Sequence, residues 1–307
     1  MSRFKKELDL AIELANKATN ITEWFRKKGF ESFLKLDQSP VTLADFASQI
    51  YIISQLKENF PDDEIIAEEE NIDFINLKAE NLIKQCFKEL NLMKIKDIID
   101  NIRFRGKSSE RQWTVDPIDG TLGYQEGLSY AVGIGFMVES IPKICAIAVP
   151  NYLNKSLAIF SAEEGQGSQV LHNNENFNPI VVNQNENIDN IRLCHSLHYD
   201  QPWVLDFAKK IGIKNYIQID SMAKFCMVAE GNADLYIKPL DVAHSFTWDF
   251  MPGNLIVKEA GGEVTDLNGE SLHFKKEKCL WTAPGIIASN GLLHNKILEL
   301  YHKTLIK

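Results

Sequence analysis

The sequence predicts a mixed α/β protein with two domains, and three observations support this class. The chain has 307 residues, a length that suits about two domains or one large one. Residues 129–170 contain successive β-rich runs with no helix between them, which favours antiparallel pairing. Further along, strand-like and helix-like segments alternate, as in an α/β layer. We therefore expect an N-terminal α+β domain over residues 1–175 and a C-terminal α/β domain over residues 176–307.

The first hundred residues are predicted to be mainly helical. Apolar residues recur at helical spacing on one face of residues 3–27, and Gly29 ends or interrupts this helix. Thr42 is suited to cap a second helix, which Pro61 stops. Residues 72–102 also show helical spacing. The apolar positions behind these predictions are Phe4, Leu8, Ala11, Ile12, Ala15, Ala18 and Ile21, then Phe46, Ile50, Ile53 and Leu56, then Leu82, Ile83, Phe87 and Leu90.

The predicted strands follow in order. EIIAEEE at 64–70 is typical of a short buried strand that runs into three glutamates. WTV at 113–115 is a second strand, and 129–149 contains two more with a turn near 140–143. Residues 156–170 add strands around a glycine-rich turn. The asparagine-rich segment 173–190 is interpreted as a loop or linker near the domain boundary. IRLCHS at 191–196 and PWVLDFAKKIG at 202–212 begin the alternating strand and helix pattern.

Composition narrows the class of protein. The formal net charge is −9 and the sequence pI is about 5.4, which argues against a general binder of nucleic acid or acidic membranes. A small anionic substrate stays compatible, because metal ions or local cations can hold it. The five cysteines show no zinc or disulfide spacing, so we expect free buried thiols. The charged N-terminus and the lack of any long apolar run favour a cytoplasmic protein.

Carboxylates gather at the ends of the expected elements. They are Asp45 early in a helix, Glu68 and Glu69 at a strand end, Asp116 and Asp119 in WTVDPIDGT, and Asp249 in TWDF. Clustered carboxylates repel one another and raise each other's pKa. Hard divalent cations remove that repulsion, and Mg²⁺ prefers oxygen ligands of this kind. No histidine or cysteine cluster has transition-metal spacing, which disfavours zinc.

The WTVDPIDGT stretch is suited to place these acids next to a phosphate group. A strand would deliver Asp116, and Pro117 would turn the chain so that the Ile118 carbonyl faces the same space as Asp116 and Asp119. Gly120 permits close approach of the backbone. If Thr121 begins a helix, its free N–H groups face an anion. One short stretch could then hold two cations and a phosphate, the arrangement used for phosphoryl transfer to water.

Each piece also has a plainer interpretation. DPxDG can be an ordinary turn, and AEEE can be a solvated surface run. Asp249 can cap a helix that Gly261 and Gly262 end. Asp45 can be a first-turn acid favoured by the helix dipole. These alternatives stay open at the level of single motifs.

The motifs taken in order resemble a known family. VTLAD, AEEE, WTVDPIDGT and WDFMPGNLIVKEAGG resemble the lithium-sensitive, Mg²⁺-dependent phosphatase superfamily that includes inositol monophosphatase, over residues 40–290. Within it, SPVTLADFASQ, FPDD, GLSYAVGIGF and DSMAKFCMVAEGNADLYIK look most similar to the 3′(2′),5′-bisphosphate nucleotidases. The resemblance implies a layered α/β/α/β/α sugar-phosphatase fold.

The resemblance also implies roles for the acids. Two or three Mg²⁺ ions would be held by Glu68, Asp116, the Ile118 carbonyl, Asp119 and Asp249. Asp45, paired with Thr121, would position and deprotonate the attacking water, and Glu69 would support the water shell. Gly120 and Thr121 would bind the phosphate through backbone amides. Inhibition by Li⁺ is implied as well.

Substrate contacts are implied by the same resemblance. Ser221 and Lys224 would face a second phosphate, and Lys238 would add a basic contact. His198, or alternatively His195, would lie near an adenine base. The plainer alternative is that the lysines are solvated surface residues and the histidines are structural.

The implied activity is hydrolysis of the 3′-phosphate of adenosine 3′,5′-bisphosphate to AMP and phosphate. The sulfated form, 3′-phosphoadenosine 5′-phosphosulfate, would give adenosine 5′-phosphosulfate, which suggests a clearance role in sulfur metabolism. The alternative is an inositol polyphosphate 1-phosphatase or inositol monophosphatase, with dual activity possible because the metal site would be the same. A non-catalytic sensor is disfavoured, since every expected acid is present. The expected partner is a small phosphorylated nucleotide, bound by a monomer.

Overall fold

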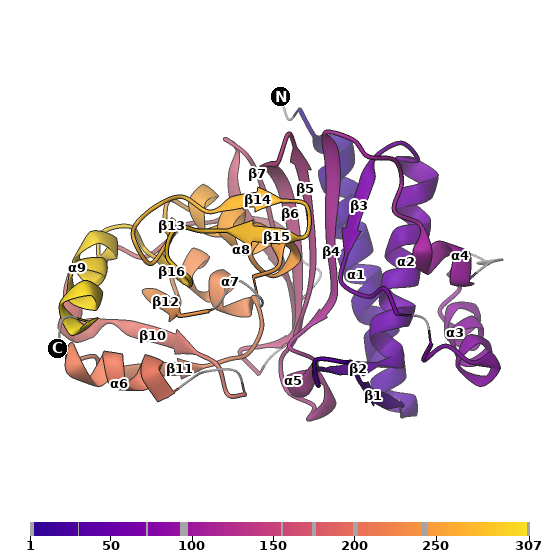
Figure 1. The fold of residues 1–307 in the computed structure, drawn as a ribbon, viewed down its shortest axis with the longest axis horizontal. Coiled ribbons are helices and arrows are strands. Elements are labelled where there is room, and N and C mark those ends of the chain that lie inside the picture. The colour runs from indigo at the N-terminus through magenta and orange to yellow at the C-terminus, as the bar shows by residue number, and fades with distance from the viewer. Residues whose placement is uncertain are drawn as a thin grey trace.

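The computed structural model describes residues 3–29, 31–71, 73–92, 98–154, 156–173, 176–198, 202–240 and 245–305. Two sheets and three helical layers alternate across the molecule (Figure 1). Helices α1 (Lys5–Lys28) and α2 (Leu43–Asn59) form one outer layer, and α6 (Pro202–Lys210) and α9 (His294–Leu305) form the other. Helices α7 (Ala223–Ala229) and α8 (Thr247–Glu259) lie between the sheets. The α/β/α/β/α order expected from the resemblance is confirmed.

The larger sheet of the described chain has seven strands in chain order, and β3 and β4 are parallel while the remaining pairs are antiparallel. The antiparallel pairing predicted after residue 129 is therefore confirmed. Its strands are β3 (Glu64–Ala67), β4 (Arg111–Asp119), β5 (Ala131–Val138), β6 (Ile141–Tyr152), β7 (Ser156–Glu163), β8 (Gly167–His172) and β9 (Phe177–Ile180).

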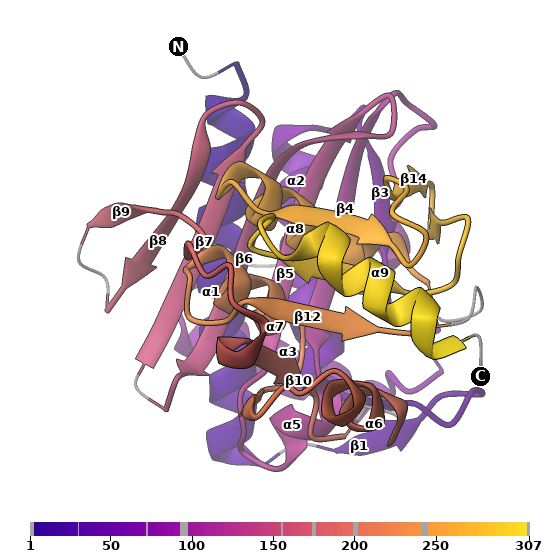
Figure 2. The same cartoon turned by 90° about the vertical axis from the view of Figure 1, so that its left-hand side faces the viewer.

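The smaller sheet has five described strands in the order β11-β10-β12-β16-β13, and it is mixed. Figure 2 views the molecule from the side of α9, which covers this sheet. The strands are β10 (Arg192–His195), β11 (Asn215–Gln218), β12 (Leu235–Lys238), β13 (Glu263–Asp266) and β16 (Ile286–Ser289). Short elements complete the described chain: hairpins β1 (Ser32–Leu34) with β2 (Pro40–Thr42) and β14 (His273–Lys275) with β15 (Lys278–Leu280), and helices α3 (Leu77–Glu89), α4 (Ile98–Arg103), α5 (Thr121–Gln125) and η1 (Ile188–Asn190).

The seven-stranded sheet is buried on both faces, and the alternation of side chains decides what each face meets. On β4, Trp113 and Val115 belong to the core shared with α1 and α2. Thr114 and Asp116 point to the opposite face, where α8 packs. On that face β5 carries Gly133 and Gly135, and a Cβ at Gly135 would lie 2.1 Å from the Met251 side chain of α8. Gly135 thus lets α8 approach β5, the strand that pairs with the acid-bearing strand β4.

Three secondary-structure predictions need correction. The helix predicted over 72–102 is two helices, α3 and α4, and residues 72 and 93–97 of it lie outside the described residues. The turn predicted near 140–143 lies at Glu139 and Ser140, which both have positive φ (54° and 63°), as hairpin turns require. The segment 173–190, predicted as a loop, contains β9 and η1. Its polar composition hid β9, a short edge strand in which Ile180 is buried and Pro179 is tolerated.

The change from one sheet to the other lies between β9 and β10. Strand β9 pairs with β8, so it belongs to the first sheet although it follows residue 175. Residues 174–175, where the boundary was predicted, lie outside the described part of the chain. Division of the chain into two domains at this change of sheet stays a proposal. Within the described residues, no helix is both long enough and apolar enough to span a bilayer.

Candidate active site

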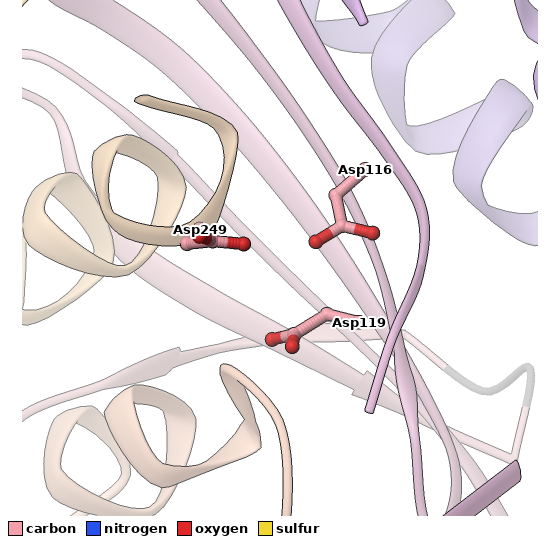
Figure 3. Close-up of side chains that lie close together, drawn as sticks. All are labelled: Asp116, Asp119 and Asp249. Atoms are coloured by element: carbon pink, nitrogen blue, oxygen red, sulfur yellow. The ribbon is translucent and has the colours of Figure 1, made fainter. Parts of the chain in front are cut away.

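Three aspartates from distant parts of the chain meet between the large sheet and α8. Asp116 and Asp119 come from β4, and Asp249 comes from the first turn of α8 (Figure 3). One carboxylate oxygen of each lies within 4.8 Å of those of the other two. Asp116 is buried, whereas Asp119 and Asp249 are partly exposed. The expectation that these acids converge is confirmed, while their role as metal ligands is a proposal taken up below.

A bulge explains how Asp116 and Asp119 reach the same space. Residues three apart on a regular strand point to opposite faces. The pairing of β4 with β5 shifts register between Asp116 and Asp119. Such an insertion re-aims the side chains that follow it. Ser48 of α2 secures the bulge by donating to the Pro117 carbonyl at 3.2 Å.

Asp249 lies inside α8 and does not cap it. The N-cap residue is Phe246, whose side chain makes no capping hydrogen bond, and Asp249 lies three residues further along. The interpretation of Asp249 as an ordinary cap is therefore wrong. The predicted end of the helix is confirmed, because α8 stops at Glu259 and Gly261 follows with a φ of 87°.

The chemistry of the cluster fits a divalent cation. Both carboxylate oxygens of Asp116 are buried without a hydrogen-bond partner among the described residues. Burial, together with Glu68, Asp119 and Asp249, raises the pKa of Asp116 well above its ordinary value. Burial, together with Asp119 and Glu68, raises the pKa of Asp249 well above its ordinary value. Buried acids without donors are costly unless a cation compensates them, and oxygen ligands of this type suit Mg²⁺.

Glu68 and Glu69 extend the acid cluster at the end of β3. Glu69 is buried with 3% exposed, so AEEE is not a solvated surface run, although Glu70 is exposed. Gln49 of α2 fixes the turn, because its amide donates to the Glu69 carbonyl and accepts from the Glu69 N–H at 2.9 Å. Burial and the neighbouring Glu68 raise the pKa of Glu69.

Lys35 is a site residue that the sequence analysis missed. Its ammonium, in the turn between β1 and β2, lies 2.8 Å from Glu68 and 2.6 Å from Glu69. Burial alone would lower the pKa of Lys35, but the two carboxylates raise it above its ordinary value. No motif marked this lysine, since its partners lie more than thirty positions away.

Asp45 and Thr121 come together as the resemblance implied. Asp45 Oδ2 accepts from the Thr42 N–H at 2.8 Å and from its hydroxyl at 2.6 Å, which completes a capping box for α2. Asp45 Oδ1 faces the Thr121 hydroxyl at 3.5 Å. Burial raises the pKa of Asp45 to about 7. Asp45 is thus a first-turn acid with one oxygen in the cap and the other toward Thr121.

The predicted helix after WTVDPIDGT is α5. Gly120 precedes it with a φ of 86°, a conformation that suits glycine. The Thr121 hydroxyl donates to the Ile118 carbonyl at 3.2 Å. A Cβ at Gly120 would lie 3.2 Å from the Ser221 Cβ, so the two predicted phosphate-binding segments are in direct contact.

The DSMAK segment contacts the acids through its backbone. Ser221 has a φ of 69°, and the Met222 N–H that follows donates to Asp119 Oδ2. The pKa of Asp119 is raised to about 6, because burial outweighs Lys224 and this hydrogen bond. The role of the Met222 amide was not predicted from the DSMAK motif.

The two predicted lysines differ in their surroundings. Lys224 is 3% exposed, its ammonium donates to the Ser196 hydroxyl at 2.9 Å, and it lies over the Tyr236 ring. The solvated alternative is therefore wrong for Lys224. Lys238 ends β12, is partly buried, and lowers the pKa values of Asp119 and Asp249 through its charge. The roles of both lysines and of Ser221 toward a second phosphate stay proposals.

Both ring nitrogens of His198 are engaged by carboxylates. Nδ1 lies 2.5 Å from Asp220 Oδ2, and Nε2 lies 3.1 Å from Glu126 Oε2. His195, the alternative, has its Nδ1 3.1 Å from the Ser196 carbonyl and its ring edge-on to Tyr216. Asp220 and Glu126 were not assigned from the sequence.

A layered α/β fold with carboxylates gathered beside α8, between its sheets, is compatible with the class of enzymes that use divalent cations in phosphoryl transfer. Comparison with known proteins then gives the family. A sequence profile of the inositol monophosphatase family matches residues 5–305. The chain belongs to the inositol monophosphatase family.

Curated relatives extend over nearly the whole chain. A 3′(2′),5′-bisphosphate nucleotidase of Emericella nidulans is 30% identical and aligns with 98% of this chain and 99% of its own length. One from Schizosaccharomyces pombe is 31% identical, with 96% and 95% covered. The 3′,5′-bisphosphate nucleotidase 2 of Arabidopsis thaliana is 30% identical, with 98% and 97% covered.

Solved structures share the fold. The IMPase of Thermotoga maritima superposes with a TM-score of 0.73 at 22% identity, covering 98% of each chain. An inositol monophosphatase from Anabaena gives a TM-score of 0.67 at 19% identity, covering 98% of this chain and 96% of its own. At these identities the similarity establishes the fold alone.

Proposed function

We propose that this protein is a Mg²⁺-dependent 3′(2′),5′-bisphosphate nucleotidase that removes the 3′-phosphate of adenosine 3′,5′-bisphosphate. The observation that carries the proposal is the acid cluster beside the Ser221–Lys224 segment, in a chain about 30% identical to nucleotidases along its length. A buried lysine next to the acids supports a second anionic group on the substrate. The sulfated nucleotide is a second proposed substrate.

The proposed cation site consists of oxygen atoms alone. Glu68, Asp116, Asp119, Asp249 and the Ile118 carbonyl would hold two or three Mg²⁺ ions, with Glu69 supporting their water shell. When bound, Mg²⁺ supplies Lewis-acid stabilisation of the phosphoryl oxygens, and Li⁺ is proposed to inhibit by competing for one site. The orphaned oxygens of Asp116 support this assignment.

The protein's own groups would position the water and the phosphate. Asp45, anchored through its Oδ2 by Thr42, presents Oδ1 and the Thr121 hydroxyl to the attacking water. Water attacks phosphorus, the bond to the ribose 3′-oxygen breaks, Asp45 accepts the proton, and solvent water protonates the leaving oxygen. A pKa of about 7 suits a base that works near neutral pH. The backbone amides of Gly120 and Thr121 would hold the phosphate.

A substrate panel tests the proposal. Steady-state rates with Mg²⁺ are measured on adenosine 3′,5′-bisphosphate, inositol 1-phosphate and inositol 1,4-bisphosphate, with and without millimolar lithium chloride. We expect the highest kcat/KM on the nucleotide and a loss of activity with lithium. The family also contains inositol monophosphatases, and a preference for an inositol phosphate would replace the proposed substrate with that class.

A further inference from the structure

The His198 imidazole joins two parts of the site that are far apart in the chain. Asp220 lies between β11 and α7, and Glu126 directly follows α5. Asp220 Oδ1 also accepts from the Leu197 N–H at 2.8 Å, and its Oδ2 meets His198. The Asp220 side chain is 2% exposed, that of His198 15%, and that of Glu126 56%. The contact of His198 with Glu126 is therefore more solvated and weaker than its contact with Asp220.

The chemistry of the partners defines the protonation state of the ring. A carboxylate accepts hydrogen bonds and does not donate them. A neutral imidazole carries one N–H, so it can satisfy one of two carboxylates. An imidazolium carries two, so it can donate to Asp220 and Glu126 together. Simultaneous donation to both carboxylates therefore needs the charged ring.

The surroundings of His198 agree with that state. The hydrogen bonds and charges of Asp220 and Glu126 raise the pKa of His198 above its ordinary value, although burial opposes them. The pKa of Asp220 is lowered against the effect of burial by His198 and by the charge of Lys224 from α7. Within the part of the chain that the structure describes, the charged groups that contact the ring include two carboxylates, and the Lys224 ammonium acts through Asp220.

Helix α5 is the element that this contact holds. On the side of α1, Arg26 donates to the Tyr124 and Leu128 carbonyls at 3.3 and 3.2 Å, and its guanidinium lies over the Tyr124 ring. On the opposite side α5 packs closely on Asp220, since a Cβ at Gly123 would lie 3.5 Å from Asp220 Oδ2 and 2.8 Å from the Ser129 carbonyl.

Backbone hydrogen bonds connect the two ends of α5. The helix is short, and its hydrogen bonds run from Tyr124 N–H to the Gly120 carbonyl and from Glu126 N–H to the Leu122 carbonyl. We therefore expect a displacement at Glu126 to be transmitted to Gly120 and Thr121 at the other end of the helix.

We propose that protonated His198 is a positioning residue that clamps the end of α5, through Glu126, to Asp220 and so orients the Gly120–Thr121 phosphate-binding turn. This inference rests on the proposed function for the role of that turn. It differs from the implied contact of His198 with a base, because the clamp acts on the phosphate that every substrate shares.

The test compares Glu126→Gln and His198→Gln with the wild type between pH 6 and 9. The substrates are adenosine 3′,5′-bisphosphate and inositol 1-phosphate, which has no base. Glu58→Gln, on the exposed end of α2, is the matched control for loss of one surface carboxylate. We expect kcat/KM near pH 6.5 to fall about two- to fivefold for Glu126→Gln and about tenfold for His198→Gln, on both substrates.

The pH dependence separates the clamp from other roles. The wild-type clamp forms below the pKa of His198 and opens as the pH rises through it. The ratio of variant to wild-type kcat/KM should therefore rise toward one at alkaline pH. A ratio that is constant with pH would mean a merely structural role, and a loss confined to the nucleotide would mean a base contact; either result overturns the clamp.

A direct titration keeps the proposal testable if a variant is poorly folded. Imidazole resonances of the wild type and Glu126→Gln are followed by NMR, with His198→Gln used for assignment. We expect a wild-type pKa for His198 above about 6.5, and a lower one in Glu126→Gln. A wild-type value at or below the ordinary one overturns the clamp. If the nucleotide is not hydrolysed but inositol 1-phosphate is, the proposed substrate fails while the clamp is still measured on the second substrate.

Discussion

Asp116 shows how one side chain can be costly for folding and useful for binding. Its two buried oxygens have no hydrogen-bond partner among the described residues, and its acidic neighbours raise its pKa. A group in this state destabilises the protein unless a cation compensates it.

We predict opposite effects of Asp116→Asn on stability and activity. The metal-free protein should become more stable, because a buried repulsive charge is removed, while the rise in Tm on adding Mg²⁺ should shrink. Turnover should fall by more than about 10–100-fold. Loss of a residue that only hydrogen-bonds to a metal ligand has an effect of that size, and Asp116 is proposed to be a ligand itself. Calorimetry with and without Mg²⁺ and steady-state kinetics measure both, with Asp100→Asn, at an exposed position of α4, as the control. Full turnover in Asp116→Asn would contradict the proposed cation site.

The Lys35 ammonium compensates the charges of Glu68 and Glu69 at the end of β3. We predict that Lys35→Met lowers the stability of the metal-free protein by about 1–3 kcal/mol, because buried Glu69 loses its cation. The same change should lower the Mg²⁺ concentration needed for half-maximal activity, since Glu68 is released from a competing charge. Denaturant unfolding and Mg²⁺ titration measure the two effects. A higher Mg²⁺ requirement would instead mean that Lys35 helps to hold the cation or substrate.

Helix α2 organises the site from one face. Asp45, Ser48 and Gln49 lie three and four residues apart, so they share a side of the helix. They meet Thr121, the Pro117 carbonyl and the Glu69 backbone respectively. A single element thus sets the relative positions of three segments that are separate in the sequence.

The cap of α2 gives a prediction for this element. Thr42→Ala should destabilise the protein by about 1 kcal/mol through loss of the cap. It should also lower kcat about tenfold with little change in KM, because Asp45 Oδ2 loses the Thr42 hydroxyl that orients it. Thr42→Ser, which keeps the hydroxyl, should restore both properties. Equal kcat in Thr42→Ala and the wild type would argue against Asp45 as the base.

For the molecule as a whole, the acid cluster predicts an unusual dependence of stability on pH. The folded pKa values of Asp45 and Asp119 are raised to about 7 and about 6, and those of Asp116, Asp249 and Glu69 are raised as well. Between the ordinary pKa of a carboxyl group, about 4, and these raised values, the folded state binds more protons than the unfolded state. The folded state therefore loses stability as the pH rises through this interval. The buried His294, whose pKa is lowered to about 4, opposes this trend with one proton.

We therefore predict that the metal-free protein loses stability between about pH 4 and 7. With saturating Mg²⁺ the direction should reverse, because the ligands must be deprotonated to bind and protons then compete with the cation. Unfolding free energies in EDTA and in Mg²⁺, measured at several pH values, give the two slopes. Parallel slopes would show that Mg²⁺ does not bind these acids.

The amino-acid pattern alone determined the class of fold and the chemistry of the site. Apolar spacing indicated α1 and α2, the helix-free run after residue 129 indicated an antiparallel sheet, and the order of acid motifs indicated the family. These features are local, or are carried by short motifs whose residues are neighbours in the chain.

Only the tertiary structure decided which groups meet. The bulge that turns Asp119 to the side of Asp116, the ammonium of Lys35 on Glu68, and the clamp of His198 between Asp220 and Glu126 all depend on contacts between distant segments. The sequence did not predict strand β9, because this polar segment is a strand only through its pairing with β8. The sequence determines which chemical groups are present. Charge compensation depends on the distances between these groups, and the packing of the two sheets around α7 and α8 sets those distances.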